Sequence, residues 1–217
     1  MADLKLHELT GSPNSVKVRI ALGYKQLDYD RQPLEFENFP GDRSPLIKLS
    51  RQPRAPVLEH GKTVLFDSGA ILRYLEANFP DAPAIFSNDY MAHSEIETWE
   101  LFARTQLGEA IGMIFGQAFA PEQDASVIAK ANALLNERTG SLEDRLSGRE
   151  FLVGDHLTAA DIVVAAPLYL TDLTDENAAA HPVASFFQKS LQLGEGRETT
   201  RAWVRRVIAH DPIKGKR

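Results

Sequence analysis

The first 80 residues alternate short apolar segments with turn residues, which is typical of a small domain built from strands and helices. Leu4, Leu6 and Leu9 form a partly alternating segment that predicts a strand, ended by the turn cluster at residues 11–14. Val16, Ile20 and either Leu22 or Tyr24 then mark one face of a helix, and residues 27–33 predict a second strand. A strand, a helix and a strand in this order favour a parallel strand pair.

Residues 56–66 predict an antiparallel hairpin, because two short apolar segments flank the tight turn at residues 60–62. The segment before it, residues 36–54, contains several prolines and predicts a loop with one helical turn near Leu46. After the hairpin, residues 67–69 open a helix that Pro80 stops. The first 80 residues therefore read as βαβ followed by ββα.

Beyond Phe66 no strand-like alternation appears, and from Asn88 the pattern is helical throughout. Apolar residues at positions 96, 99, 103, 107, 110 and 114 predict one long amphipathic helix, and residues 123–146 predict a second. Thr158 and Asp161 have the spacing of a capping box before a fully apolar helix, for which we expect a purely structural role. We therefore expect an α/β domain in residues 1–80, a linker in 81–87 and an all-helical domain in 88–217.

The composition of the chain argues against several classes of function, beginning with nucleic-acid binding. The 217 residues are 43% hydrophobic and 25% charged, as in ordinary globular proteins, and the net charge of −6 gives no overall attraction for nucleic acid. Cysteine is absent, so any thiol chemistry must use a thiol that the substrate brings. We find no secretion signal, membrane span, metal-site motif or nucleotide-binding glycine motif. We expect a cytoplasmic protein without a metal or nucleotide cofactor, and without a nucleic-acid or membrane partner.

The turn that holds Ser12, Asn14 and Ser15 is the first candidate for chemistry. It lies at the predicted start of a helix, where free backbone amides and a partial positive charge stabilise anions, thiolates included. A serine hydroxyl here can donate a hydrogen bond to a bound anion. Alternatively, Ser12 or Ser15 simply caps the helix.

Two further places could bind an amino acid or peptide. Proline at position 56 fits the start of a strand, and a cis bond after Ala55 would turn the Ala55 backbone toward an extended peptide ligand. At the next helix start, Ser68 and the free amides suit a carboxylate, and Asp67 suits an ammonium group. The alternative for Asp67 and Ser68 is again a simple helix cap.

Five segments together resemble the serine-type cytosolic glutathione transferases, in that family's order and spacing. They are TGSPNSVKVRIAL, KLSRQPRAPVLEHG, FDSGAILRYLEANFP, WELFARTQL and FLVGDHLTAADIVVAAPLY. The resemblance covers nearly the whole chain. It implies a thioredoxin-like N-terminal domain, an all-helical C-terminal domain, a homodimer and glutathione as co-substrate.

The resemblance also assigns roles to residues. Ala55 matches the residue whose backbone pairs with the cysteinyl part of glutathione, and Pro56 matches the cis-proline that follows it in the family. Asp67 and Ser68 match the pair that holds the γ-glutamyl end. Arg54 matches a position near the glycyl end. Ser12 matches the hydroxyl that activates the thiol, with Asn14 and Ser15 as supporting candidates. The choice between Ser12 and Ser15 depends on how the turn is aligned with the family. The chain departs from the family at Pro53, where glycine is usual.

The implied activity is transfer of glutathione to small electrophiles. A glutathione-dependent disulfide or peroxide reductase is an alternative, which Asn14 favours, and a non-catalytic binding module is another. The electrophile pocket would lie between the domains, and its candidate walls are Phe102, Gln106, Met113 and Phe115. For each of these four residues, packing in the core is the alternative.

Overall fold

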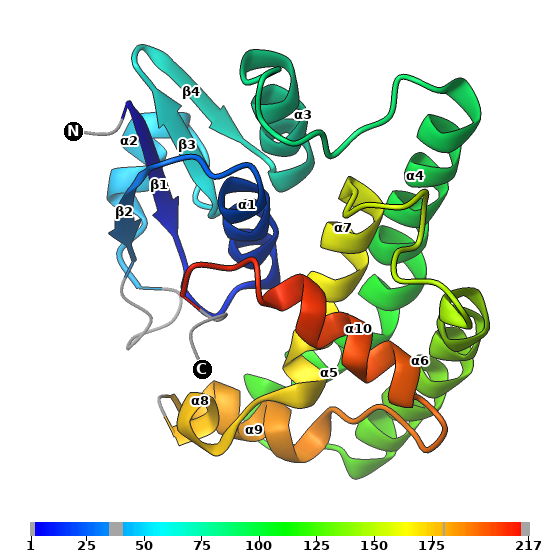
Figure 1. Cartoon of the computed structure of the whole chain (residues 1–217). Coiled ribbons are helices and arrows are strands. Elements are labelled where there is room, and N and C mark those ends of the chain that lie inside the picture. Colours follow the sequence, from blue (N-terminus) through cyan, green and yellow to red (C-terminus); the bar gives the residue numbers. More distant parts are fainter. Residues whose placement is uncertain (1–2, 35–40, 180, 214–217) are drawn as a thin grey trace. The chain divides into compact units, whose positions relative to one another are not determined.

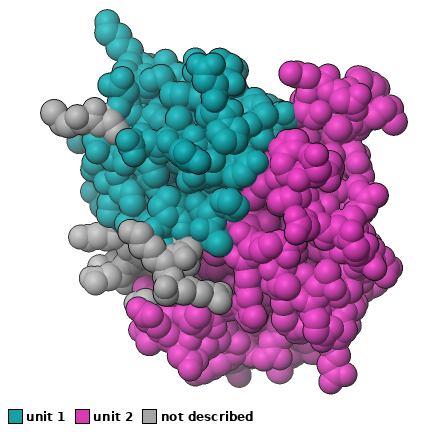
Figure 2. All heavy atoms as spheres, viewed as in Figure 1, with its two compact units in different colours: residues 1–86, 209–217 teal, residues 87–208 magenta. Residues whose placement is uncertain are grey.

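The computed structural model describes residues 3–34, 41–179 and 181–213. The chain forms two compact units, one made of Met1–Phe86 with Ala209–Arg217 and the other of Ser87–Ile208 (Figure 2). We expected everything after residue 87 to belong to the helical domain. In the structure, the last segment, which begins at Ala209, belongs instead to the first unit. Asp211 in this segment is buried against residues of that unit.

Unit 1 contains a four-stranded sheet in the order β2-β1-β3-β4 (Figure 1). The strands are β1 (Leu4–Glu8), β2 (Asp30–Pro33), β3 (Val57–His60) and β4 (Thr63–Phe66). β1 runs parallel to β2 and antiparallel to β3, while β3 and β4 form the predicted hairpin. This arrangement confirms the expected thioredoxin-like fold.

The helices of unit 1 are α1 (Pro13–Tyr24), α2 (Ser44–Ser50) and α3 (Ser68–Asn78). Proline at the first position of α1 favours its start, because the missing N–H has no partner there in any helix. α3 buries one face, including Ile71, Leu72 and Leu75. α1 is buried over most of its surface, and Arg19 is among its fully buried residues. Residues 35–40, which include the first five residues of the 36–54 segment that we expected to be a loop, lie outside the described residues.

Unit 2 is all-helical, as expected from the sequence. Its regular elements are α4 (Tyr90–Phe102), α5 (Gly108–Ala118), α6 (Ala125–Leu146), α7 (Ala159–Leu168), α8 (Asp175–Ala179), α9 (Pro182–Ser190) and α10 (Glu198–Ile208). A short 3₁₀ helix, Tyr169–Asp172, follows α7. Across the described part of the chain, none of the helices combines the length and the apolar character that a membrane crossing requires.

The predicted long helix is interrupted in its middle by a π-helical segment, Ala103–Leu107, between α4 and α5. The apolar spacing could not predict this interruption, because intervals of four such as Trp99, Ala103 and Leu107 also fit one face of a regular α-helix. Within the π segment, Ala103 and Leu107 are 8% and 0% exposed.

The capping box before α7 is confirmed. Asp161 Oδ2 accepts hydrogen bonds from Thr158 N at 2.9 Å and from Thr158 Oγ1 at 3.0 Å. Its Oδ1 accepts from Leu152 N at 2.9 Å and Trp203 Nε1 at 3.0 Å. Burial raises the pKa of Asp161, although these hydrogen bonds act in the opposite direction. The residue holds three segments of unit 2 together, as a structural role requires.

Candidate functional site

Sheet register brings the three candidate segments to one end of the sheet. Val57 lies opposite His7 on β1 and opposite Phe66 on β4. Because β3 runs antiparallel to both neighbours, the chain leaves β1 and β4 at the end where it enters β3. The turn after β1, the Ala55–Pro56 step and the start of α3 therefore emerge side by side within unit 1.

Ser12 occupies the cap position of α1, with extended backbone angles of φ −72° and ψ 128°, yet its side chain makes no capping hydrogen bond. The residue is half-buried, and its backbone N donates to Leu9 O at 2.9 Å. The cap alternative for Ser12 is therefore not realised. Its hydroxyl remains available at the positive end of α1.

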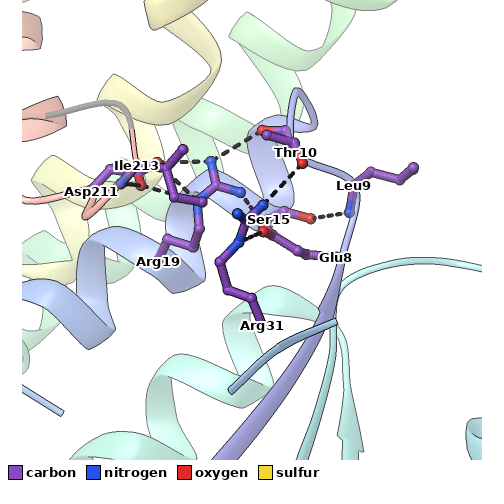
Figure 3. A network of polar contacts seen from close by, with 8 residues as sticks. All are labelled: Glu8, Leu9, Thr10, Ser15, Arg19, Arg31, Asp211 and Ile213. Atoms are coloured by element: carbon purple, nitrogen blue, oxygen red, sulfur yellow. Dashed lines mark hydrogen bonds and ion pairs between the residues drawn. The ribbon is translucent and has the colours of Figure 1, made fainter. Parts of the chain in front are cut away.

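Ser15 has a different environment. Its side chain is fully buried, and its Oγ accepts a hydrogen bond from Leu9 N at 3.2 Å (Figure 3). This contact ties the first turn of α1 to the end of β1. Asn14 is exposed, and its Oδ1 accepts from Lys17 Nζ at 3.0 Å. Of the three polar residues in the turn, the geometry thus favours Ser12 as the group that faces a ligand.

The Ala55–Pro56 bond is cis. Ala55 is half-buried and Arg54 is exposed, directly before β3. The loop that precedes them is held by Gln52, which sequence reasoning missed. Its Oε1 accepts from Arg54 N and its Nε2 donates to Arg54 O, both at 2.7 Å, while Nε2 also donates to Ser50 Oγ at 3.0 Å. A glutamine side chain thus fixes the loop in which Pro53 replaces the usual glycine; nothing in its sequence context signalled this.

The start of α3 combines backbone strain with a cap. Asp67 has φ 71° and ψ 120°, a conformation that L-residues rarely adopt, and its Oδ1 accepts from Ala70 N at 3.0 Å. Conformations of this kind cost about 1–3 kcal/mol and gather at functional sites. Asp67 is exposed, whereas Ser68 is only 9% exposed. The cap alternative is realised for Asp67, which leaves its second carboxylate oxygen for a ligand.

The predicted pocket residues occupy two neighbourhoods in unit 2. Phe102, half-buried at the end of α4, packs edge-on against Trp99 with ring centroids 5.4 Å apart. Phe115 on α5 is 41% exposed and stacks with Phe187 at 6.2 Å. Phe115 follows Phe102 by thirteen positions of helix, or about 20 Å along the axis. Gln106 is exposed in the π segment, and Met113 is half-buried on α5.

Comparison with known proteins identifies the family of both units. The family models for the N-terminal and the C-terminal domain of glutathione S-transferases match residues 6–83 and 102–211. The solved theta class glutathione S-transferase of Xanthomonas axonopodis pv. citri, which has glutathione bound, shares the fold. Its TM-score is 0.76 at 19% identity, with 97% of each chain covered.

Two sequence relatives carry different names. Elongation factor 1-gamma 1 of Oryza sativa is 30% identical over 77% of this chain, and this chain spans 40% of that protein's length. Glutathione S-transferase 3 of Zea mays is 28% identical over 74% of this chain and 75% of its own length. The relatives thus do not agree on one activity. Both domain matches, in their order along a thioredoxin-like unit and a helical unit, establish that the chain belongs to the glutathione S-transferase family.

Proposed function

We propose that this protein is a glutathione transferase that binds glutathione at the shared end of β1, β3 and β4 and activates its thiol with Ser12. The observation that carries the proposal is the position of Ser12. It stands at the N-terminus of α1 with a hydroxyl that caps nothing, beside the cis Ala55–Pro56 step. A capping hydroxyl would already be used; this one is left for a ligand.

The other two segments suit the rest of the tripeptide. The Ala55 backbone, at the entry to β3, suits pairing with the extended cysteinyl part. Ser68 and the first amides of α3 suit the γ-glutamyl carboxylate, since the first four N–H groups of a helix lack partners within the helix. Asp67 suits the ammonium group of the same end. The exposed guanidinium of Arg54 suits the glycyl carboxylate.

The chemistry then follows from charge placement. A hydroxyl donor and the N-terminus of α1 stabilise the thiolate over the thiol, which lowers the thiol pKa. Each unit of that change corresponds to about 1.4 kcal/mol. The thiolate sulfur attacks an electrophilic carbon, a C–S bond forms, and the leaving group departs with the electron pair of its broken bond. Ser12 stays a hydrogen-bond donor throughout and forms no covalent intermediate.

The proposal extends to the partners. The second substrate is a small electrophile, for which Phe102, Gln106, Met113 and Phe115 remain the candidate contacts. A second copy of the chain would cover apolar side chains that are exposed within each unit, among them Phe66 at 51% and Leu101 at 50%. We place this homodimer in the cytoplasm.

A non-catalytic module of the same fold is the second candidate. The relatives named elongation factor 1-gamma favour it, because they are not named as transferases. This chain spans 40% of the length of those two proteins. The two candidates differ in one measurable property. A transferase lowers the pKa of the bound thiol, whereas a scaffold has no need to do so.

The deciding experiment follows the ultraviolet absorbance of the glutathione thiolate against pH in the presence of the protein. We expect a bound thiol whose pKa is lower than that of free glutathione. Ser12→Ala should raise that pKa by about one unit or more and leave affinity nearly unchanged. Binding with an unshifted thiol would favour the scaffold, and the same rise in Ser15→Ala alone would overturn the role of Ser12.

Activity assays then separate transfer from reduction. Conjugation of an aryl halide should exceed reduction of a glutathione mixed disulfide, and both rates should fall in Ser12→Ala. A protein that only reduces the mixed disulfide would contradict the transferase assignment while leaving thiol activation in place.

A further inference from the structure

The described end of the chain, residues 209–213, packs tightly against α1 within unit 1. A Cβ atom added to Gly23 would lie 2.0 Å from the backbone oxygen of His210 and 3.2 Å from Pro212 Cδ. The His210 ring also meets the Tyr24 ring edge-on, with centroids 5.2 Å apart. Glycine at position 23 is thus what allows the tail, residues 209–213, to approach the helix backbone.

The tail contributes one carboxylate to a buried cluster of charges (Figure 3). Arg19 Nε donates to both oxygens of Asp211 at 3.0 Å, and Arg19 Nη2 donates to Asp211 Oδ2 at 2.8 Å. Arg19 Nη1 donates to Glu8 Oε2, and Arg31 Nε donates to Glu8 Oε1 at 2.5 Å. The side chains of Arg19, Glu8 and Asp211 are 0% exposed. Two guanidinium groups face two carboxylates, so the formal charges of these four residues cancel.

The two carboxylates keep Arg19 charged despite its burial. Burial by itself would lower the pKa of Arg19, but its hydrogen bonds to Asp211 and Glu8 and their charges raise it above the ordinary value. Arg19 therefore stays charged and needs both carboxylates. A buried ion cluster contributes little net stability compared with apolar packing, so its distinctive contribution is a fixed geometry.

That geometry extends into the turn before Ser12. Arg19 Nη2 also donates to Thr10 O at 3.1 Å, and Arg31 Nη2 donates to Thr10 Oγ1 at 3.2 Å. Ser15 holds Leu9 N, and Leu9 O accepts from Ser12 N. The turn of residues 9–12 is thus held from α1 and β2. The same Arg19 Nη2 atom that holds Thr10 is oriented by Asp211.

We propose that Asp211 is a positioning residue for Ser12, acting through Arg19 and the backbone of Thr10. The proposal rests on the proposed role of Ser12 in thiol activation. The tail then belongs to the machinery of the thioredoxin-like unit although 192 positions separate Asp211 from Arg19. Without the tail, Arg19 is free to turn toward Glu8 alone, and Thr10 loses its fixed donor. Small displacements of a catalytic group are costly, because activation depends on hydrogen-bond geometry.

Two independent substitutions test the proposal. Asp211→Asn removes the charge while keeping the shape, and Gly23→Ala displaces the tail without substituting any residue of the cluster. Asp172→Asn is the matched control, since Asp172 pairs with Arg205 in unit 2 through two hydrogen bonds of 2.6 and 2.7 Å. The first readout is hydrogen exchange at the Leu9 and Ser12 amides. The second is the pKa of the bound glutathione thiol, measured together with its dissociation constant.

We expect about tenfold faster exchange at both amides in Asp211→Asn and Gly23→Ala, with the β3 amides unchanged. The bound thiol pKa should rise by about half a unit or more, while the dissociation constant stays within about twofold, since Ala55, Asp67 and Ser68 are untouched. The control should show neither change. Unchanged exchange and unchanged thiol pKa in both variants would overturn the proposal, as would weaker binding with an unchanged thiol pKa.

The exchange measurement separates this proposal from the proposed function. If the unmodified protein binds no glutathione, the function fails, yet the exchange rates at Leu9 and Ser12 still decide whether the tail holds the turn. If Asp211→Asn does not fold, Gly23→Ala carries the same test, because it leaves every charge in place.

Discussion

The starts of α1 and α3 lie at the same end of the sheet but are held in different ways. At α3, the support is local: Asp67 precedes the helix and accepts from Ala70 N, three residues further on. At α1, the support comes from Glu8, Arg31 and Asp211, which belong to β1, β2 and the tail. The start of α3 can therefore form with its own helix, whereas the start of α1 requires the rest of unit 1.

The largest expected effect follows from breaking the distant support. Arg19→Gln leaves Asp211 buried without its cation, and such a loss typically costs about 3–5 kcal/mol. Arg205→Gln breaks a comparable pair with Asp172, but Arg205 is 51% exposed, and surface pairs contribute about 0–1 kcal/mol. Chemical denaturation of both variants measures the difference in free energy of unfolding. Equal losses of unfolding free energy in the two variants would show that the buried cluster stabilises the fold no more than a surface ion pair does.

A smaller effect, on affinity rather than stability, is expected at the start of α3. Ser68→Ala should remove the hydrogen bond that we propose to the γ-glutamyl carboxylate, and a charged bond of this kind contributes about 1.5–3 kcal/mol, or roughly 10- to 150-fold in the dissociation constant. Asp67→Gly should also weaken binding but should change the free energy of unfolding by less than about 0.5 kcal/mol, because glycine tolerates the positive φ. Calorimetric titration with glutathione measures the dissociation constants of both variants, with the exposed Ser94→Ala as control. Chemical denaturation measures the free energy of unfolding of Asp67→Gly.

An unchanged dissociation constant in Ser68→Ala would remove that residue from the binding site. A large loss of stability in Asp67→Gly would show that the start of α3 depends on more than its local cap.

A third helix start, that of α10, extends the comparison to unit 2 and has the smallest expected effect. Glu143 on α6 accepts from Thr199 N at 2.9 Å and Thr200 N at 2.8 Å. Partial burial acts to raise the pKa of Glu143, but the hydrogen bonds from Thr199 and Thr200 lower it from 4.5 to about 2. Because the folded-state pKa lies below the unfolded one, this contribution is complete above pH 4.5 and is lost as pH falls toward 2.

Glu143→Gln should therefore lose about 1 kcal/mol at neutral pH and show a shallower fall in stability between pH 4.5 and 2. Thermal unfolding across this range, with the exposed Glu97→Gln as control, provides the measurement. Parallel stability curves for Glu143→Gln and the unmodified protein would contradict the role of Glu143.

The same division between local and distant support explains what the sequence could predict. The hairpin of β3 and β4, the start of α3 and the Thr158–Asp161 capping box depend on residues within a few positions of one another, and all three were predicted. The pairing of Arg19 with Asp211 was not, because periodicity assigns a residue to a helix face without naming its partner. The available signal was a charged residue, Arg19, directly between the apolar residues Val18 and Ile20.

In the candidate site, too, features that depend on neighbouring residues could be predicted and those that depend on distant contacts could not. The positions of Ser12, Ala55 and Ser68 were predicted from short motifs, and sheet register then brought their segments together. The realised hydrogen bonds of Ser15 and Gln52 could not be predicted, because each depends on the path of a loop. Spacing alone left Ser12 and Ser15 equivalent, and burial separates them.

The distance between Arg19 and Asp211 along the chain also has a consequence for biosynthesis. A ribosome that adds about 5–20 residues per second needs roughly 10–40 s to make the intervening 192 residues. Throughout that interval the nascent Arg19 has Glu8 but not Asp211, and the surface of α1 around Gly23 lacks its cover. N-terminal domains commonly fold first during synthesis. Here the N-terminal unit reaches its final packing only after the whole of unit 2 has been made.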